Sequence, residues 1–176
     1  MTFEFPPFTQ AHVVISLIGI VAGFPVVAGL VTGRRLPVLS AVFLASTTAT
    51  SVTGFFFPIE RFTPALAVGG VSLTALALAF YSRYVRGATG GWRRVYAGTA
   101  LLAQYLNVFV LVAKLFQKVP ALHEVPFAVV QGVVLLGFMT VAYVVLTRPL
   151  IASGTPHRRS PDDAWRSNRA YDSLRP

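Results

Sequence analysis

The chain contains no cysteine, which excludes disulfide bonds, thiolate metal sites and catalytic thiols. Charge is scarce as well, because charged residues make up 12% of the 176 residues, against about 25% in an ordinary soluble domain. Hydrophobic residues make up 55%, and the mean hydropathy is +0.66. This composition excludes an ordinary soluble protein and indicates one that lies in a lipid bilayer.

Long stretches without a charged residue indicate where the chain crosses the bilayer. Roughly 20 apolar residues in a helix span the hydrocarbon core, which is about 30 Å thick. The sequence therefore predicts an all-α integral membrane bundle with five transmembrane helices, at about residues 12–32, 38–58, 64–82, 94–117 and 126–147. We expect a short extracytoplasmic tail at 1–11 and a disordered, basic cytoplasmic tail at 148–176.

Arginine and lysine are divided unevenly between the two sides of these spans. All but Arg61, Lys114 and Lys118 fall in the loops after spans one and three or in the C-terminal tail. By the positive-inside rule, the N-terminus lies outside and the C-terminus lies in the cytoplasm. The net charge of +9 is then a topology signal and not a sign of nucleic-acid binding. We expect anionic lipid headgroups at the cytoplasmic arginines.

Small residues at four-residue spacing mark two expected helix-packing faces. One is formed by Gly19 and Gly23 in span one, and the other by Ala41, Ala45 and Ala49 in span two. Side chains this small let a neighbouring helix backbone approach closely.

Span two also carries a hydroxyl face made of Ser46, Thr50 and Thr53. Such hydroxyls can line a polar pathway. They can equally bond the carbonyl four residues back in their own helix, and that structural role is the one we favour.

Polar side chains gather in the outer half of the predicted bundle, and they suggest an outward-facing pocket. Its floor is expected to be Gln104 and Asn107 of span four, with Lys114, Glu60 and His12 at the rim and Gln131 in the outer third of span five. Amides in hydrocarbon need partners, so this polar side should face the bundle interior. The alternative for Lys114 is that it extends along the helix end to reach water.

The membrane interior lacks the groups that most chemistry needs. No acid, histidine or cysteine lies deep in any predicted span, so we assign no catalytic residue and no metal site. No cofactor is predicted either. A haem with two histidine ligands would need inward-facing imidazoles, whereas His12 is expected at a helix end and His123 in a loop.

Three stretches resemble a family of small multi-spanning bacterial inner-membrane proteins that is uncharacterised and has no established activity. They are residues 51–58 (SVTGFFFP), 105–112 (YLNVFVLV) and 116–122 (FQKVPAL). The resemblance covers most of residues 12–147, and it implies a location and a topology but no reaction.

Taken together, these features favour a non-catalytic membrane component, meaning a subunit, an assembly factor or a sensor. Its expected partners are the lipid bilayer and either another membrane protein or further copies of the chain. One alternative is a small-molecule or ion permease that uses the outward-facing pocket. A second alternative is an accessory protein in electron transfer linked to haem or quinone.

Overall fold

The computed structural model describes residues 7–57 and 64–147. Every regular element within these ranges is a helix. A π-helical turn, η1 (Tyr81–Val85), extends α3, and a short 3-10 helix, η2 (Pro120–Glu124), precedes α5. The five α-helices are α1 (Pro7–Thr32), α2 (Pro37–Gly54), α3 (Pro64–Phe80), α4 (Gly91–Lys118) and α5 (Phe127–Thr147). The expected all-α class is therefore confirmed.

Proline marks where α2 begins, because Pro37 is its first residue. Proline is favoured at this position because its fixed φ suits a helix and its missing N–H would have no partner there. The turn after α1 contains Gly33 at a φ of +75°, a backbone conformation that glycine adopts without strain.

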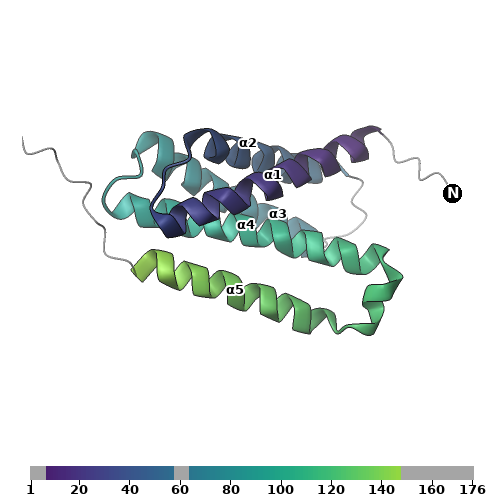
Figure 1. Cartoon of the computed structure of the whole chain (residues 1–176). Coiled ribbons are helices and arrows are strands. Elements are labelled where there is room, and N and C mark those ends of the chain that lie inside the picture. Colours follow the sequence, from purple (N-terminus) through teal and green to yellow (C-terminus); the bar gives the residue numbers. More distant parts are fainter. Residues whose placement is uncertain (1–6, 58–63, 148–176) are drawn as a thin grey trace, which may run out of the picture.

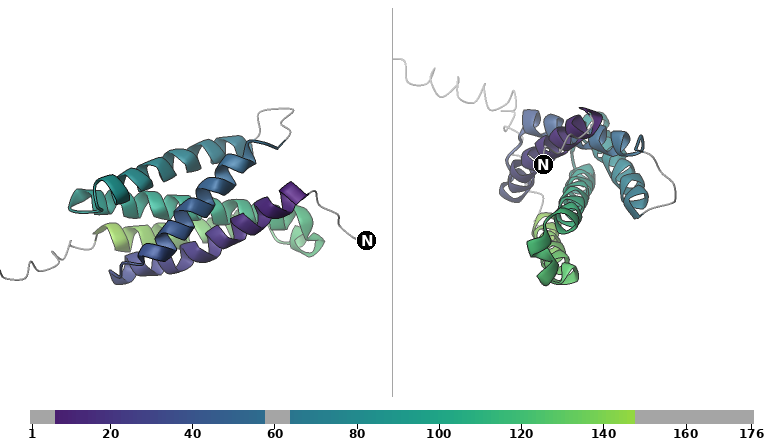
Figure 2. Two further views of the ribbon diagram at one scale, coloured as in Figure 1. Left: turned by 90° about the horizontal axis from the view of Figure 1, so that it is seen from above. Right: turned by 90° about the vertical axis from the view of Figure 1, so that its right-hand side faces the viewer.

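Successive helices run up and down alongside one another, and α4 lies at the centre of the bundle (Figure 1). In the end-on view of Figure 2, α1, α2 and α3 lie on one side of α4, and α5 lies on the other. Helix α4 contacts α1, α3 and α5, whereas α5 packs mainly on α4. The fifth helix therefore extends from a bundle formed by the first four.

The hydrophobic core is formed where these first four helices meet. Phe43 and Leu44 of α2 and Ala79 of α3 are completely buried, together with Ala103 of α4. Helix α5 contributes one buried residue, and that residue is the polar Gln131. Apolar burial thus holds α1 to α4 together much more strongly than it holds α5.

Four helices in the described ranges are long and apolar enough to cross a membrane, which supports a membrane protein. They are α1, residues 66–85, α4 and α5. Helix α2 does not reach that hydropathy, because its central and C-terminal turns are rich in serine and threonine. Predicted span two is thus present as a helix, but its hydropathy does not identify it as a span.

The helix bounds differ slightly from the predicted ones. Helix α1 begins at Pro7, so residues 7–11, expected in the N-terminal tail, belong to the first helix. Helix α2 ends at Gly54, before the predicted limit at residue 58. The predicted cytoplasmic tail at 148–176 lies outside the described residues.

The alanine face expected on α2 is not the side that packs within the chain. Ala41 and Ala45 are exposed and Ala49 is half-buried. The buried side of α2 is the opposite one, formed by Ser40, Phe43, Leu44 and Thr47. The physical reason is the apolar surface area that each side chain buries. Phe43 and Leu44 bury more of it than alanine does, so their burial contributes more free energy.

Candidate functional site

The buried amide of Gln104 joins α4 to α1. Its side chain is completely buried, and Nε2 donates a hydrogen bond to the carbonyl oxygen of Ile20 at 3.0 Å. Gly23 leaves the space that this amide occupies, because a β-carbon there would overlap it. The other amide atom, Oε1, is buried and has no hydrogen-bond partner among the described residues.

One turn further along α4, Asn107 joins the same helix to α2. Its Nδ2 donates to the hydroxyl oxygen of Thr47 at 3.0 Å. Thr47 is almost fully buried at 1% exposure, and it lies against Gly19 of α1. Sequence reasoning did not select Thr47 as a site residue. Its three- and four-residue spacing from Leu44 and Phe43, on the buried side of α2, is the signal that would have found it.

The two glycines of α1 therefore face different neighbours. A β-carbon on Gly19 would lie 3.1 Å from the hydroxyls of Ser46 and Thr47 on α2, whereas one on Gly23 would meet Gln104 on α4. This pair lets α1 approach two helices at once, which is what small residues in a membrane helix permit.

At the other end of α1, His12 is joined to Thr53 of α2, with His12 Nδ1 and Thr53 Oγ1 2.8 Å apart. The threonine hydroxyl donates to the carbonyl of Ala49 at 2.7 Å, which leaves its oxygen to accept from His12 in the tautomer that carries a proton on Nδ1. The ring of His12 also meets Phe57 edge to face, at 5.1 Å between centroids. His12 thus fastens the first two helices together.

The hydroxyl face of α2 divides into bonded and unbonded members. Ser46 donates to the carbonyl of Val42 at 2.6 Å, just as Thr53 bonds within its own helix. Thr50 differs, because its hydroxyl is buried and has no partner among the described residues. Ser46 and Thr53 both donate their hydroxyl proton within α2, and of the three hydroxyls only that of Thr50 has no partner among the described residues.

The structure does not bring all the expected pocket residues together. Lys114 is exposed, and its Nζ lies 3.4 Å from Oε1 of Gln117 on the same helix. Glu60, the expected counter-charge, lies outside the described residues.

Gln131 lies on α5, and its amide forms no hydrogen bond with Gln104 or Asn107. Its side chain is 8% exposed, and neither atom of its amide has a partner among the described residues. A buried amide without a partner carries a desolvation cost. A hydrogen bond to or from a further molecule at this position would offset that cost.

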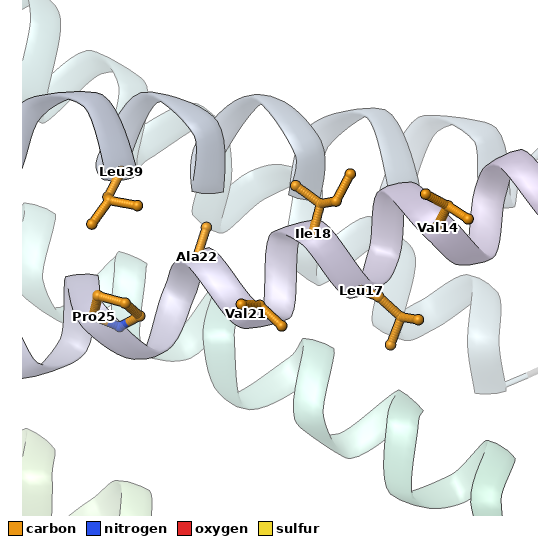
Figure 3. A pocket seen from close by; sticks show the side chains of 7 residues that line it. All are labelled: Val14, Leu17, Ile18, Val21, Ala22, Pro25 and Leu39. Atoms are coloured by element: carbon orange, nitrogen blue, oxygen red, sulfur yellow. The ribbon is translucent and has the colours of Figure 1, made fainter.

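The grooves on the bundle surface do not coincide with these polar residues. One groove of about 440 Å³ is apolar, and it is lined by six side chains of α1 together with Leu39 of α2 (Figure 3). A second, of about 350 Å³, lies near the N-terminus of α1 beside Lys118. Neither groove is lined by Gln104 or Asn107.

Histidine and acidic residues do not cluster in the described part of the chain, where no three of them lie close enough to hold a metal ion. His12 has one ring nitrogen engaged by Thr53. The side chain of His123 lies outside what the structure describes. The arrangement that the described residues show is a set of hydrogen bonds between helices.

Comparison of the chain with protein-family models, with curated proteins and with solved structures finds no match.

Proposed function

We propose that this protein is a non-catalytic component of the bacterial inner membrane, acting as a subunit, an assembly factor or a sensor. The observation that carries the proposal is how the chain uses its interior polar groups. Gln104, Asn107 and His12 each bond a neighbouring helix. Side chains engaged in this way hold helices in register, and hydrogen bonds of this kind are the usual polar link between membrane helices.

The proposal includes five crossings. Helix α2 has 18 residues, about 27 Å at 1.5 Å per residue, which is close to the thickness of the hydrocarbon core. It runs antiparallel to α1 and returns the chain to the end where α3 begins (Figure 2). Its hydroxyls lower its hydropathy, but those of Ser46 and Thr53 bond their own helix, which makes them tolerable in lipid.

The proposed orientation rests on the distribution of charge. The turns after α1 and α3 carry Arg34, Arg35, Arg83 and Arg86, whereas the far end of α4 carries Lys114 and Lys118. With the arginine-bearing turns in the cytoplasm, the N-terminus lies outside.

Helix α5 supports a role that involves a partner. Leu136 is 68% exposed and Tyr143 71%, and Val133 and Met139 lie on the same side of the helix. A helix that packs mainly on one neighbour leaves a wide apolar face for lipid, for another membrane protein or for a second copy. We propose that a partner helix covers part of this face.

The absence of cysteine makes the test direct. A single cysteine at Leu136, in an otherwise unchanged chain, is crosslinked in native membranes with a thiol-reactive bifunctional reagent. The second group of the reagent is photoactivated, so it bonds any neighbouring chain, and we expect a discrete product whose mass identifies a second copy or a different membrane protein. Val71→Cys, on the exposed side of α3, is the matched control and should give no discrete product. Equal and diffuse crosslinking from both positions would contradict a specific role for α5.

A permease is the second candidate, and it is favoured by one observation. Gln104 Oε1, the Thr50 hydroxyl and the amide of Gln131 are buried and have no partner among the described residues. Such groups can bind a solute or water on a pathway. Purified protein in liposomes, assayed for proton and potassium flux with indicator dyes, tests this directly. Flux that Thr50→Val abolishes would replace the first proposal with this one.

A further inference from the structure

Positive charge is concentrated at one end of the bundle, which we call the arginine end. It comprises the turn after α1, with Arg34 and Arg35, and the hairpin between η1 and α4 with its flanking turns, including Arg83, Arg86 and Arg93. The only acidic residue in the described ranges, Glu124, lies in η2 at the opposite end. The arginine end therefore carries a net positive field that no acidic side chain of the described residues balances.

Aromatic rings hold two of these guanidinium groups in place. Arg83 lies over the rings of Tyr84 and Tyr96, at 5.8 and 5.1 Å, and Arg86 lies over Trp92 at 5.0 Å. A cation–π contact of this kind engages the charge of the guanidinium and uses none of the N–H groups along its planar edges for hydrogen bonding. Edges of that kind match the oxygens of a phosphate.

The backbone adds to this arrangement. Residues 81–85 form a π-helical turn, a local departure from the α-helix that is frequent at functional sites. Helix α4 then begins at Gly91, and no side chain caps its first turn. The N–H groups of Trp92 and Arg93 donate instead to the carbonyls of Thr89 and Gly90, at 3.0 and 3.3 Å. The N-terminal end of a helix carries a partial positive charge, so α4 adds to the positive field at this end. Arg93 extends toward Gly33, where a β-carbon would lie 3.9 Å from its Nη2 atom, so both turns contribute to one surface.

Apolar side chains adjoin these cations. Tyr84 is 56% exposed and Val85 67% exposed, and both belong to the same π-helical turn as Arg83. A free phosphate ion makes no favourable contact with this apolar surface. A phospholipid can contact both parts, because its phosphate binds the cations while the start of its acyl chains packs on the apolar residues.

We propose that the arginine end holds a binding site for the headgroup of an anionic phospholipid, with Arg83 and Arg86 as its main ligands. This inference deepens the proposed function and depends on the membrane location. The bound lipid bridges the two turns, and it fixes the depth at which the bundle lies in the bilayer.

The test uses Trp92, which contacts Arg86, as a reporter. The chain has two tryptophans, so Trp165→Phe leaves Trp92 as the only one. This full-length protein is placed in phosphatidylcholine bilayers that contain brominated phosphatidylglycerol or, at the same mole fraction, brominated phosphatidylcholine. Quenching of Trp92 fluorescence then gives the relative binding of the two lipids.

We expect brominated phosphatidylglycerol to be preferred, and Arg83→Gln or Arg86→Gln to lower that preference by about fivefold each. Lys114→Gln, which removes one positive charge at the other end, should leave it unchanged. Arg83→Lys should lower it too, because an ammonium keeps the charge but lacks the planar fork of N–H groups that matches phosphate oxygens. Circular dichroism checks that each variant is folded, and Arg86→Gln alone suffices if Arg83 variants fail to fold.

The remaining outcomes are also decisive. Equal quenching by both lipids, or an Arg83→Lys variant identical to the parent protein, would overturn the headgroup site and leave the membrane location intact. Competition by millimolar inorganic phosphate would overturn it in favour of a free-anion site. If neither lipid quenches Trp92, the reporter is not in contact with a bilayer, and the proposed membrane placement fails with it.

Discussion

The amide of Gln104 on α4 occupies the space that Gly23 leaves on α1, and it donates to the carbonyl of Ile20 one turn before that glycine. A polar side chain and a missing side chain thus fit together where two helices cross. The contact joins the central helix to the first one in a part of the bundle where water does not reach, so its loss cannot be compensated by solvent.

Gly23→Ala should therefore destabilise the protein by about 1–3 kcal/mol, because the new methyl group displaces a fully buried, hydrogen-bonded amide. Thermal unfolding followed by circular dichroism in mild detergent measures the effect. Gly70→Ala is the matched control, since no atom lies within 4 Å of a β-carbon there. In a Gln104→Ala background the Gly23→Ala change should become nearly neutral. An equal cost in both backgrounds would show that the amide is not what the methyl group meets.

The bond between Asn107 and Thr47 predicts energetic coupling between α4 and α2. A double-mutant cycle with Asn107→Ala and Thr47→Val should give a coupling free energy of about 0.6 kcal/mol, the average for hydrogen bonds between membrane helices. Unfolding by a denaturing detergent in mixed micelles gives the free energy of unfolding of the parent protein, the two single variants and the double variant. Pairing Asn107→Ala with Thr53→Val provides the reference, for which we expect no coupling because Thr53 bonds His12 instead.

Thr50 and Thr53 should respond in opposite ways to the same change. Thr53→Val removes a hydroxyl that bonds His12 and its own helix, so we expect a loss of about 1 kcal/mol. Thr50→Val removes a buried hydroxyl that has no partner among the described residues, so stability should stay the same or rise. Thermal unfolding of the two variants, measured side by side with the parent protein, tests this difference in stability. A destabilised Thr50→Val variant would mean that this hydroxyl has a bound partner such as water or a solute.

Five crossings predict which positions are reached from outside the cell. Single cysteines at Phe56 and Gln117, beyond the ends of α2 and near the end of α4, should react with a membrane-impermeant maleimide in intact cells. A cysteine at Thr89, in the hairpin between η1 and α4, should react only after the membrane is opened. If Phe56→Cys behaves like Thr89→Cys, then α2 does not cross the bilayer and the bundle has four spans.

The sequence alone determined the class of the protein and most of its helix limits. Charge-free stretches and proline positions are local properties, because the length of an apolar stretch and the φ of proline are set without reference to the rest of the chain. The glycines of α1 could also be selected in advance, although the sequence did not show that Gly19 faces α2 and Gly23 faces α4.

Only the tertiary structure decided which polar residues meet. Gln104 and Ile20 are 84 positions apart, and Asn107 and Thr47 are 60 apart, so no local pattern could pair them. The same holds for α2, where spacing predicted an alanine packing face, whereas the contacts with α1 and α3 bury the side that carries Phe43 and Leu44. Periodicity specifies the sides of a helix, but which side is buried depends on neighbours that come from distant parts of the chain.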